Sequence, residues 1–237
     1  MTRLETVFLD AGGVLVFPNW QRISEVLAAH GVQVAADALA AVEAQAKHHL
    51  DRSRTVKASN DTQRGWQYFN LILERAGVQL NAATDAALAE LHAYHQASNL
   101  WEYMPDDVLP SLRAIGILGL KSVVVSNANG TICALAERIG IGAEVHCVLD
   151  SHTEGVEKPD PRFFEIALRR GRASRATTIH VGDIYEVDVV GARAAGIRPV
   201  LLDAAGLYPD ADCPRVQSLP ELVRRIVNEE FGTLPKR

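Results

Sequence analysis

The residue that most constrains this chain is Asp10, which stands between an apolar run and two glycines in Val7-Phe8-Leu9-Asp10-Ala11-Gly12-Gly13. Residues 7–9 predict a buried strand, and the glycines predict a turn directly after the carboxylate. Open α/β sheets bind their ligands at the carboxyl ends of such strands. An aspartate before glycines is also ordinary turn chemistry, so this segment alone leaves both interpretations open.

Three later segments place polar residues at equivalent points, after an apolar strand or at the start of a helix. They are Ser126-Asn127 after the run 123–125, Lys158-Pro159, and Gly182-Asp183 followed by Asp188. Because the carboxyl ends of parallel strands meet at one edge of a sheet, we expect these side chains to converge with Asp10.

From about residue 105 onward, short aliphatic runs alternate with helical periodicity. The expected strands cover residues 123–125, 146–149, 178–181 and 199–202, and the expected helices cover 131–139, 161–170 and 187–195. This alternation predicts right-handed crossovers and a doubly wound, mostly parallel sheet. Asp160 is the expected N-cap of the second helix, and Gly171 and Gly196 are expected to end the second and third.

Residues from about 20 to 103 have a different pattern, with little strand signal and many helix formers. Four helices are expected, at residues 23–30, 36–50, 62–76 and 84–97. An insertion of this kind between the first two strands indicates a small helical domain. Extra helices packed on the side of a single domain are the alternative.

Taken together, these motifs and their order resemble the four motifs of the haloacid dehalogenase (HAD) superfamily, whose members are mostly phosphatases. The resemblance covers the whole chain. It implies an α/β fold with a Rossmann-like, doubly wound parallel sheet as catalytic core (1–17 and 105–237) and an inserted all-helical C1 cap (18–104) that closes over the active site.

By this resemblance, Asp10 is a nucleophile that takes up a phosphoryl group and forms an aspartyl-phosphate, which water then hydrolyses. Asp10 and Asp183 supply hard oxygen ligands suited to Mg²⁺, and the backbone carbonyl of Gly12 is a further ligand. Asp188 completes the expected metal site, either by supporting the water shell of the metal or by orienting Lys158. A simple helix-end acid is the alternative for Asp188.

The resemblance also implies that Ser126 and the backbone N–H of Asn127 bind a phosphoryl oxygen. The ammonium of Lys158 would pair with Asp10 and neutralise charge in the transition state. Trp20, in the loop after the first motif, lines the substrate pocket or anchors the hinge. His48 and His49 are candidate proton donors from the cap.

The chain departs from the phosphatase pattern at Gly12, where the family places a second acid that protonates the leaving group. Four readings follow. The chain is a phosphatase that needs no acid at this position, a phosphonatase with Lys47 or Lys57 as Schiff-base lysine, a metal-free 2-haloacid dehalogenase, or a binding protein on a degenerate site. Asp183 argues against the dehalogenase, because that group carries Ser and Asn in its fourth motif.

Composition limits the partners. The net charge is −5 and no long basic run occurs, which disfavours nucleic acid. No apolar stretch approaches the roughly 20 residues that span a membrane. The three cysteines form no CxxC pair and the N-terminus enters a strand at once, so we expect a cytoplasmic protein. The expected partner is a small anionic substrate, and the expected state is a monomer or homodimer.

Overall fold

The computed structural model describes residues 2–52 and 61–235, and these divide into two compact units. One unit is formed by Met1–Phe17 together with Met104–Arg237, and the other by Pro18–Tyr103. Each unit has its own hydrophobic core. No helix in the described ranges is both long and apolar enough to cross a membrane.

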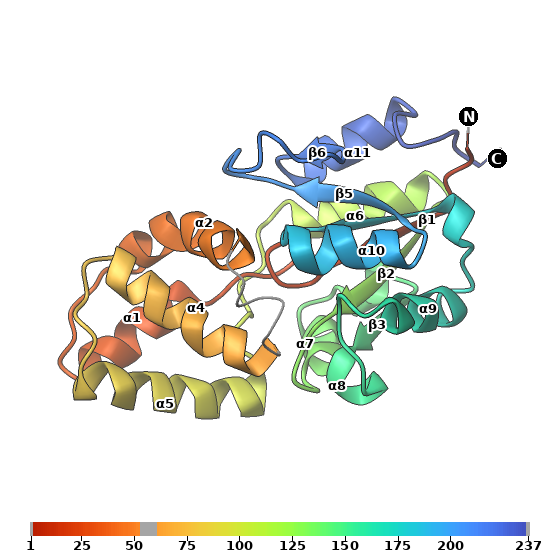
Figure 1. Cartoon of the computed structure of the whole chain (residues 1–237). Coiled ribbons are helices and arrows are strands. Elements are labelled where there is room, and N and C mark those ends of the chain that lie inside the picture. Colours follow the sequence, from red (N-terminus) through yellow and green to blue (C-terminus); the bar gives the residue numbers. More distant parts are fainter. Residues whose placement is uncertain (1, 53–60, 236–237) are drawn as a thin grey trace. The chain divides into compact units, whose positions relative to one another are not determined.

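The first unit is built on a parallel sheet, with six strands among the described residues, in the order β3-β2-β1-β4-β5-β6 (Figure 1). The strands are β1 (Thr6–Leu9), β2 (Lys121–Ser126), β3 (Cys147–Asp150), β4 (Thr178–Gly182), β5 (Arg198–Leu202) and β6 (Arg215–Val216). Phe8 of β1 lies in register with Val123 of β2 and His180 of β4. The α/β fold expected from the sequence is therefore confirmed.

Helices cover both faces of this sheet (Figure 1). One face carries α9 (Pro161–Arg170) and α10 (Val190–Ala194), and the other carries α6 (Val108–Ile117), α7 (Ile132–Arg138) and α11 (Leu219–Val227). The side chains of Val123 and Val125 alternate with that of Val124 along β2. Accordingly, Val123 and Val125 pack with Phe163 and Phe164 of α9 in one core cluster.

The ends of α9 show why this helix has the expected length. Asp160 accepts a hydrogen bond from the N–H of Arg162, which caps the helix as expected. Gly171 ends the helix as expected, and its φ of −76° is not left-handed. Arg172, with φ of +46°, has the left-handed conformation instead. A Cβ atom at Gly171 would lie 2.9 Å from Cγ2 of Val123, so the glycine lets the helix approach the sheet closely.

The helix expected at residues 187–195 has a different beginning. A π-helical turn, Tyr185–Val189, precedes α10, and the N–H of Asp188 donates to the carbonyl of Ile184 at 2.8 Å. Gly196 follows α10 and ends the helix as expected, with a left-handed φ of +72°. Single π-helical turns inside helices are frequent at functional sites. The turn places Asp188 in the interior, with 1% of its surface exposed.

The described part of the second unit is helical. It contains α1 (Trp20–Ala29), α2 (Ala36–Arg52), α4 (Asp61–Arg75) and α5 (Ala82–Ser98). Asn81 caps α5 by accepting from the N–H groups of Ala83 and Thr84, and Thr84 Oγ1 accepts from the N–H of Asn81 in return. Apolar side chains from all of these helices, including Leu27, Leu39 and Leu73, form its core.

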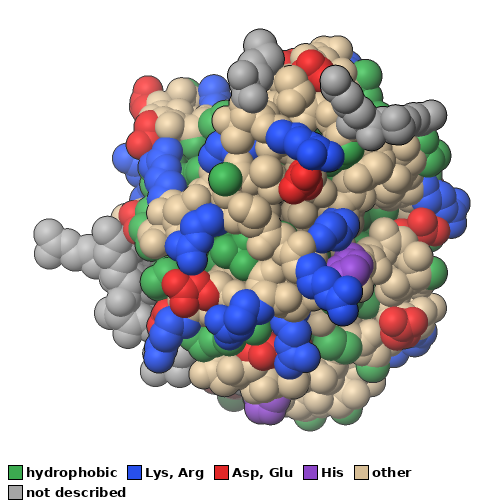
Figure 2. Space-filling model, turned by 90° about the vertical axis from the view of Figure 1, so that its right-hand side faces the viewer, with side chains coloured by type: hydrophobic (Ala, Val, Ile, Leu, Met, Phe, Trp, Pro, Cys, Tyr) green, Lys and Arg blue, Asp and Glu red, His purple; other side chains and the backbone are tan. Residues whose placement is uncertain are grey.

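Lys and Arg side chains gather on the face at the amino ends of the strands (Figure 2). The chain reaches the first residue of β4 through a segment with four exposed arginines, Arg169, Arg170, Arg172 and Arg175. Glu154 and Glu165 pair with two of them. Because Asp10 follows the carboxyl end of β1, this basic face lies at the opposite edge of the sheet from the acidic residues described next.

Candidate active site

Asp10 is fixed at the carboxyl end of β1 by its backbone and its side chain. Its N–H donates to the carbonyl of Val181 in β4 at 2.8 Å, and its Oδ1 accepts from the N–H of Ala11 at 2.7 Å. The loop then turns at Gly13, whose φ of +79° favours glycine. Only 8% of the Asp10 surface is exposed, so this residue is buried at the carboxyl edge of the sheet.

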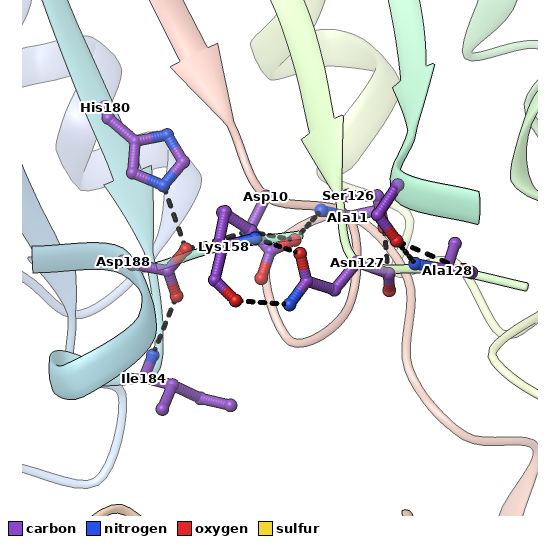
Figure 3. Close-up of polar contacts among 10 residues, drawn as sticks. Asp10, Ala11, Ser126, Asn127, Ala128, Lys158, His180, Ile184 and Asp188 are labelled. Atoms are coloured by element: carbon purple, nitrogen blue, oxygen red, sulfur yellow. Dashed lines mark hydrogen bonds and ion pairs between the residues drawn. The ribbon is translucent and has the colours of Figure 1, made fainter. Parts of the chain in front are cut away.

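Lys158 is fully buried, and its ammonium lies between two carboxylates (Figure 3). Nζ is 2.9 Å from Oδ1 of Asp10 and 2.8 Å from Oδ1 of Asp188. An unpaired buried ammonium would be very costly, and these two contacts compensate for the loss of hydration. The expected pairing of Lys158 with Asp10 is present in this geometry.

Asn127 holds the backbone of Lys158 in place. Its Nδ2 donates to the carbonyl of Lys158 at 2.9 Å, and its Oδ1 accepts from the N–H of Lys158 at 2.8 Å (Figure 3). The resemblance implies a role only for the backbone N–H of Asn127, so these two side-chain hydrogen bonds are an additional feature. Ser126 lies beside it at the end of β2, 4% exposed, and its hydroxyl donates to the carbonyl of Asn127 at 3.4 Å.

Three carboxylates converge at this edge. Asp10, Asp183 and Asp188 each offer an oxygen, and these oxygens lie within 4.8 Å of one another. Hard carboxylate oxygens are the donors that Mg²⁺ prefers, so the donor set fits the ion expected from the sequence. Gly12 lies in the same loop as Asp10 and forms a β-bridge with Val16.

Asp188 differs from the other two carboxylates in how its oxygens are used. Oδ1 accepts from Lys158 and lies 2.9 Å from Nε2 of His180, and Oδ2 accepts from the N–H of Ile184 at 3.1 Å. The interpretation of Asp188 as a simple helix-end acid is incompatible with these contacts. Of the two roles that the resemblance left open, orientation of Lys158 has direct contacts in the structure.

The electrostatics of the cluster follow from burial and pairing. Burial, together with the nearby charges of Asp188 and Asp183, raises the pKa of Asp10 to about 7, against the opposing effect of the Lys158 ammonium. The pKa of Lys158 is raised because the attraction of Asp10 and Asp188 outweighs its burial. The pKa of Asp188 is held below its usual range by Lys158 and His180, although burial opposes this. The site thus combines a carboxylate near neutral pKa with a permanent cation.

Two further residues of this edge were missed by the sequence analysis. Asp150, at the end of β3, accepts from the N–H groups of His152, Gly130 and Ile132 and fixes the loop that follows β2. Ser151 both accepts from and donates to the backbone of Ala128 in the same loop. A buried acid at the end of a strand was a signal that could have identified Asp150.

The remaining candidates lie in the helical unit. Trp20 is the first residue of α1 and packs, half buried, against the core of that unit. Lys47 on α2 forms an ion pair of 2.9 Å with Glu43, whose carboxylate also accepts from the hydroxyl of Tyr68. His48 and His49 lie on the same helix. Lys57 lies outside the described residues.

Comparison with known proteins gives consistent results. The model of the haloacid dehalogenase-like hydrolases matches residues 4–196. The bovine (Bos taurus) protein named haloacid dehalogenase-like hydrolase domain-containing protein 3 is 30% identical over 179 residues, which cover 73% of this chain and 70% of that protein. A protein of Methanopyrus kandleri named glyceraldehyde 3-phosphate phosphatase is 29% identical over 175 residues, covering 69% and 74%.

Among solved structures, the HAD-hydrolase YfnB of Bacillus subtilis, determined with bound magnesium, has a similar fold. The TM-score is 0.69 at 16% identity, and the match covers 95% of this chain and 99% of that one. The likeness concerns the fold, and the family follows from the match over residues 4–196, which spans most of the chain. This chain belongs to the haloacid dehalogenase-like hydrolases.

Proposed function

We propose that the chain is a Mg²⁺-dependent phosphatase that transfers the phosphoryl group of a small phosphorylated metabolite to Asp10. The observation that carries this proposal is the buried ammonium of Lys158, 2.9 Å from the Asp10 carboxylate, beside the converging carboxylate of Asp183. The names of relatives support it: the archaeal relative above is named as a phosphatase of a three-carbon phosphate ester.

The carboxylate of Asp10 is the attacking group. Two contacts hold this carboxylate in one orientation: Oδ1 accepts a hydrogen bond from the N–H of Ala11 and is paired with the ammonium of Lys158. Attack on phosphorus forms a bond from a carboxylate oxygen and breaks the bond to the leaving oxygen, which yields an aspartyl-phosphate and an oxyanion that takes a proton from water to become the alcohol. Water then hydrolyses the acyl phosphate and releases inorganic phosphate.

Asp10 and Asp183, with the carbonyl of Gly12, are the proposed ligands of Mg²⁺, and the ion would neutralise the charge of the phosphoryl group. The chain itself contributes the rest of the positive charge. Lys158 faces the oxygens that gain charge in the transition state, and Ser126 with the N–H of Asn127 is proposed to bind a non-bridging oxygen. Because the Lys158 ammonium is already held beside Asp10, it does not have to move when charge develops in the transition state.

Gly12 determines which substrates suit this site. A glycine offers no proton to the leaving oxygen, so the proposal favours substrates whose leaving group departs without strong assistance. We further propose that residues 18–104 act as a cap that excludes water during attack. Cytoplasmic location and a monomeric or homodimeric state complete the proposal.

Two of the alternatives can be weighed on particular contacts. Glu43 pairs with Lys47 and favours its charged form, which cannot attack an aldehyde, so Lys47 is poorly suited to the Schiff base of a phosphonatase. A metal-free dehalogenase gains nothing from Asp183 beside Asp10, because two close carboxylates repel each other without a cation between them.

The test is a panel assay with and without Mg²⁺, covering phosphomonoesters, a phosphonoaldehyde and 2-haloacids. The proposal expects Mg²⁺-dependent release of inorganic phosphate from phosphomonoesters, with no release by Asp10→Asn. Halide release in excess chelator would instead identify a dehalogenase, and phosphate release from the phosphonoaldehyde alone would identify a phosphonatase. Inactivity on the whole panel would favour the binding protein.

A further inference from the structure

His180 occupies a position in the core where an aliphatic side chain would be expected. It lies in the middle of β4, in register with Phe8 of β1, and none of its surface is exposed. Its ring packs edge-on against Phe164 of α9, with 4.9 Å between the ring centroids. An imidazole in such surroundings loses its hydration, which is unfavourable unless its polar atoms find partners.

Only one of its two ring nitrogens has such a partner. Nε2 lies 2.9 Å from Oδ1 of Asp188, whereas Nδ1 is buried with no hydrogen-bond partner in the described part of the chain. Since an ionised carboxylate only accepts, Nε2 of His180 must carry a proton and donate it to Asp188 in this hydrogen bond.

The same face of β4 supplies a second element of this arrangement. Residues two apart in a strand point to the same side, so His180 and Gly182 share a face. A Cβ atom at Gly182 would overlap the carboxylate of Asp188. The strand therefore makes room for the Asp188 carboxylate in two ways. His180 provides a hydrogen-bond donor, and Gly182 leaves the space that a side chain would fill.

The carboxylate held in this way is the one that holds Lys158. Oδ1 of Asp188 accepts from both Nε2 of His180 and Nζ of Lys158, and Oδ2 accepts from the N–H of Ile184 (Figure 3). Three donors fix its rotation. The ammonium then has one position, 2.8 Å from Asp188 and 2.9 Å from Asp10.

We propose that His180 is a positioning residue for the phosphoryl transfer: as an Nε2–H donor it fixes the carboxylate of Asp188, which in turn aims the Lys158 ammonium at Asp10. This inference rests on the proposed function. It predicts that loss of the donor affects the transition state far more than the binding of the substrate.

Three variants test it. His180→Gln keeps an N–H donor near the position of Nε2, and His180→Met fills similar volume without a donor. Phe164→Leu is the matched control, because it disturbs the packing of the same ring and leaves the hydrogen bond. We expect His180→Met to lower kcat at least tenfold on an aryl phosphate with KM changed less than threefold, and to weaken inhibition by vanadate by a similar factor. His180→Gln should recover most of the loss, and Phe164→Leu should keep kcat per folded molecule.

Crystal structures of the His180 variants separate this inference from the proposed function. The inference expects the contact between Lys158 and Asp10 to lengthen or become disordered in His180→Met and to persist in His180→Gln. A His180→Met protein with wild-type kcat and an unchanged contact would overturn it, as would equal losses in His180→Met and Phe164→Leu. If the wild-type protein releases no phosphate from any substrate, the proposed function fails, while the crystal structures still decide whether His180 positions Lys158.

Discussion

The side-chain amide of Asn127 and the backbone of Lys158 form two reciprocal hydrogen bonds, of 2.9 Å and 2.8 Å. These bonds join the end of β2 to the segment before α9, two parts of the chain separated by 31 residues. From this fixed backbone, the side chain of Lys158 brings its Nζ into contact with both Asp10 and Asp188. The position of the ammonium thus depends on the backbone clamp as well as on the two carboxylates.

Asn127→Ala removes both bonds and leaves a backbone N–H and a carbonyl of Lys158 without their partners. We expect the free energy of unfolding to fall by about 1–3 kcal/mol, because unsatisfied buried polar groups carry that cost. We also expect kcat to fall at least tenfold. The measurements are chemical denaturation and steady-state kinetics. Ser218→Ala is the control, because it removes the cap of α11 and should lower stability alone. Equal kcat in both variants would contradict the clamp.

The pKa of Asp10 gives a prediction about stability. Its pKa is about 7 in the folded chain, above the value of 3.8 that applies when it is exposed in the unfolded chain. Between these values the folded state binds the additional proton, so the stability falls as the pH rises through this window. Asp10→Asn cannot ionise. In chelator at pH 8 we expect it to be more stable than the wild type by about 1–4 kcal/mol, with the gain vanishing near pH 4.

Thermal unfolding of both proteins at a series of pH values checks this prediction. Asp188→Asn serves as the control with the opposite sign. The pKa of Asp188 is lowered in the folded chain, so its ionised form contributes stability at neutral pH that is lost as the pH falls. That variant should be less stable than the wild type at pH 8. A destabilised Asp10→Asn at pH 8 would show that the contact with Lys158 outweighs the cost of burial.

The sequence predicted the core of this fold because its strands are short, apolar and separated by helices. The alternating order of these strands and helices was sufficient to predict a parallel sheet. β6 was missed because a strand of two residues, Arg215–Val216, has no detectable period. The π-helical turn before α10 was missed because a single turn of five residues, Tyr185–Val189, is too short to show a period of its own in the sequence.

For the candidate site, the sequence predicted which residues gather but not how they bond. Asp10, Lys158 and Asp188 could be anticipated because each follows a strand or flanks a helix. The clamp by Asn127 depends on two segments that meet only in the folded chain. His180 was read as part of a strand, since a single polar residue among apolar neighbours carries no sign of its partner. Side chains alternate between the two faces of a strand, so the sequence already indicated that His180 and Gly182 lie on the same face. That shared face was the signal that could have identified His180.

Asp183→Asn tests the proposed metal site. Replacing one hard carboxylate with an amide removes a charge where the three carboxylates converge. We expect weaker Mg²⁺ binding by at least tenfold and loss of turnover, with the fold retained. Isothermal titration calorimetry with Mg²⁺ measures the binding, and circular dichroism checks the fold. Asp203→Asn is a matched control, because this buried acid at the end of β5 binds the backbone of Leu207 and Tyr208. Unchanged Mg²⁺ binding in Asp183→Asn would place the ion elsewhere.

Gly12 leads to the sharpest prediction about chemistry. Without an acid at this position, the barrier to attack by Asp10 should follow the basicity of the leaving oxygen. Aryl phosphates and sugar 1-phosphates should therefore react faster than simple alkyl phosphates. A series of phosphomonoesters with graded leaving-group pKa, at saturating Mg²⁺, measures this dependence. Asp10→Asn should be inactive on every member, since an amide is a poor nucleophile.

Gly12→Asp provides the complementary test, because it supplies the missing acid. The left-handed conformation that this loop shows lies at Gly13, the neighbouring residue. We expect this variant to gain activity on alkyl phosphates selectively and to flatten the dependence on leaving-group pKa. A flat dependence already in the wild type, with formation of the aspartyl-phosphate rate-limiting, would mean that another residue donates the proton. Alanine at His48 and at His49 would then decide whether either histidine of α2 is that donor.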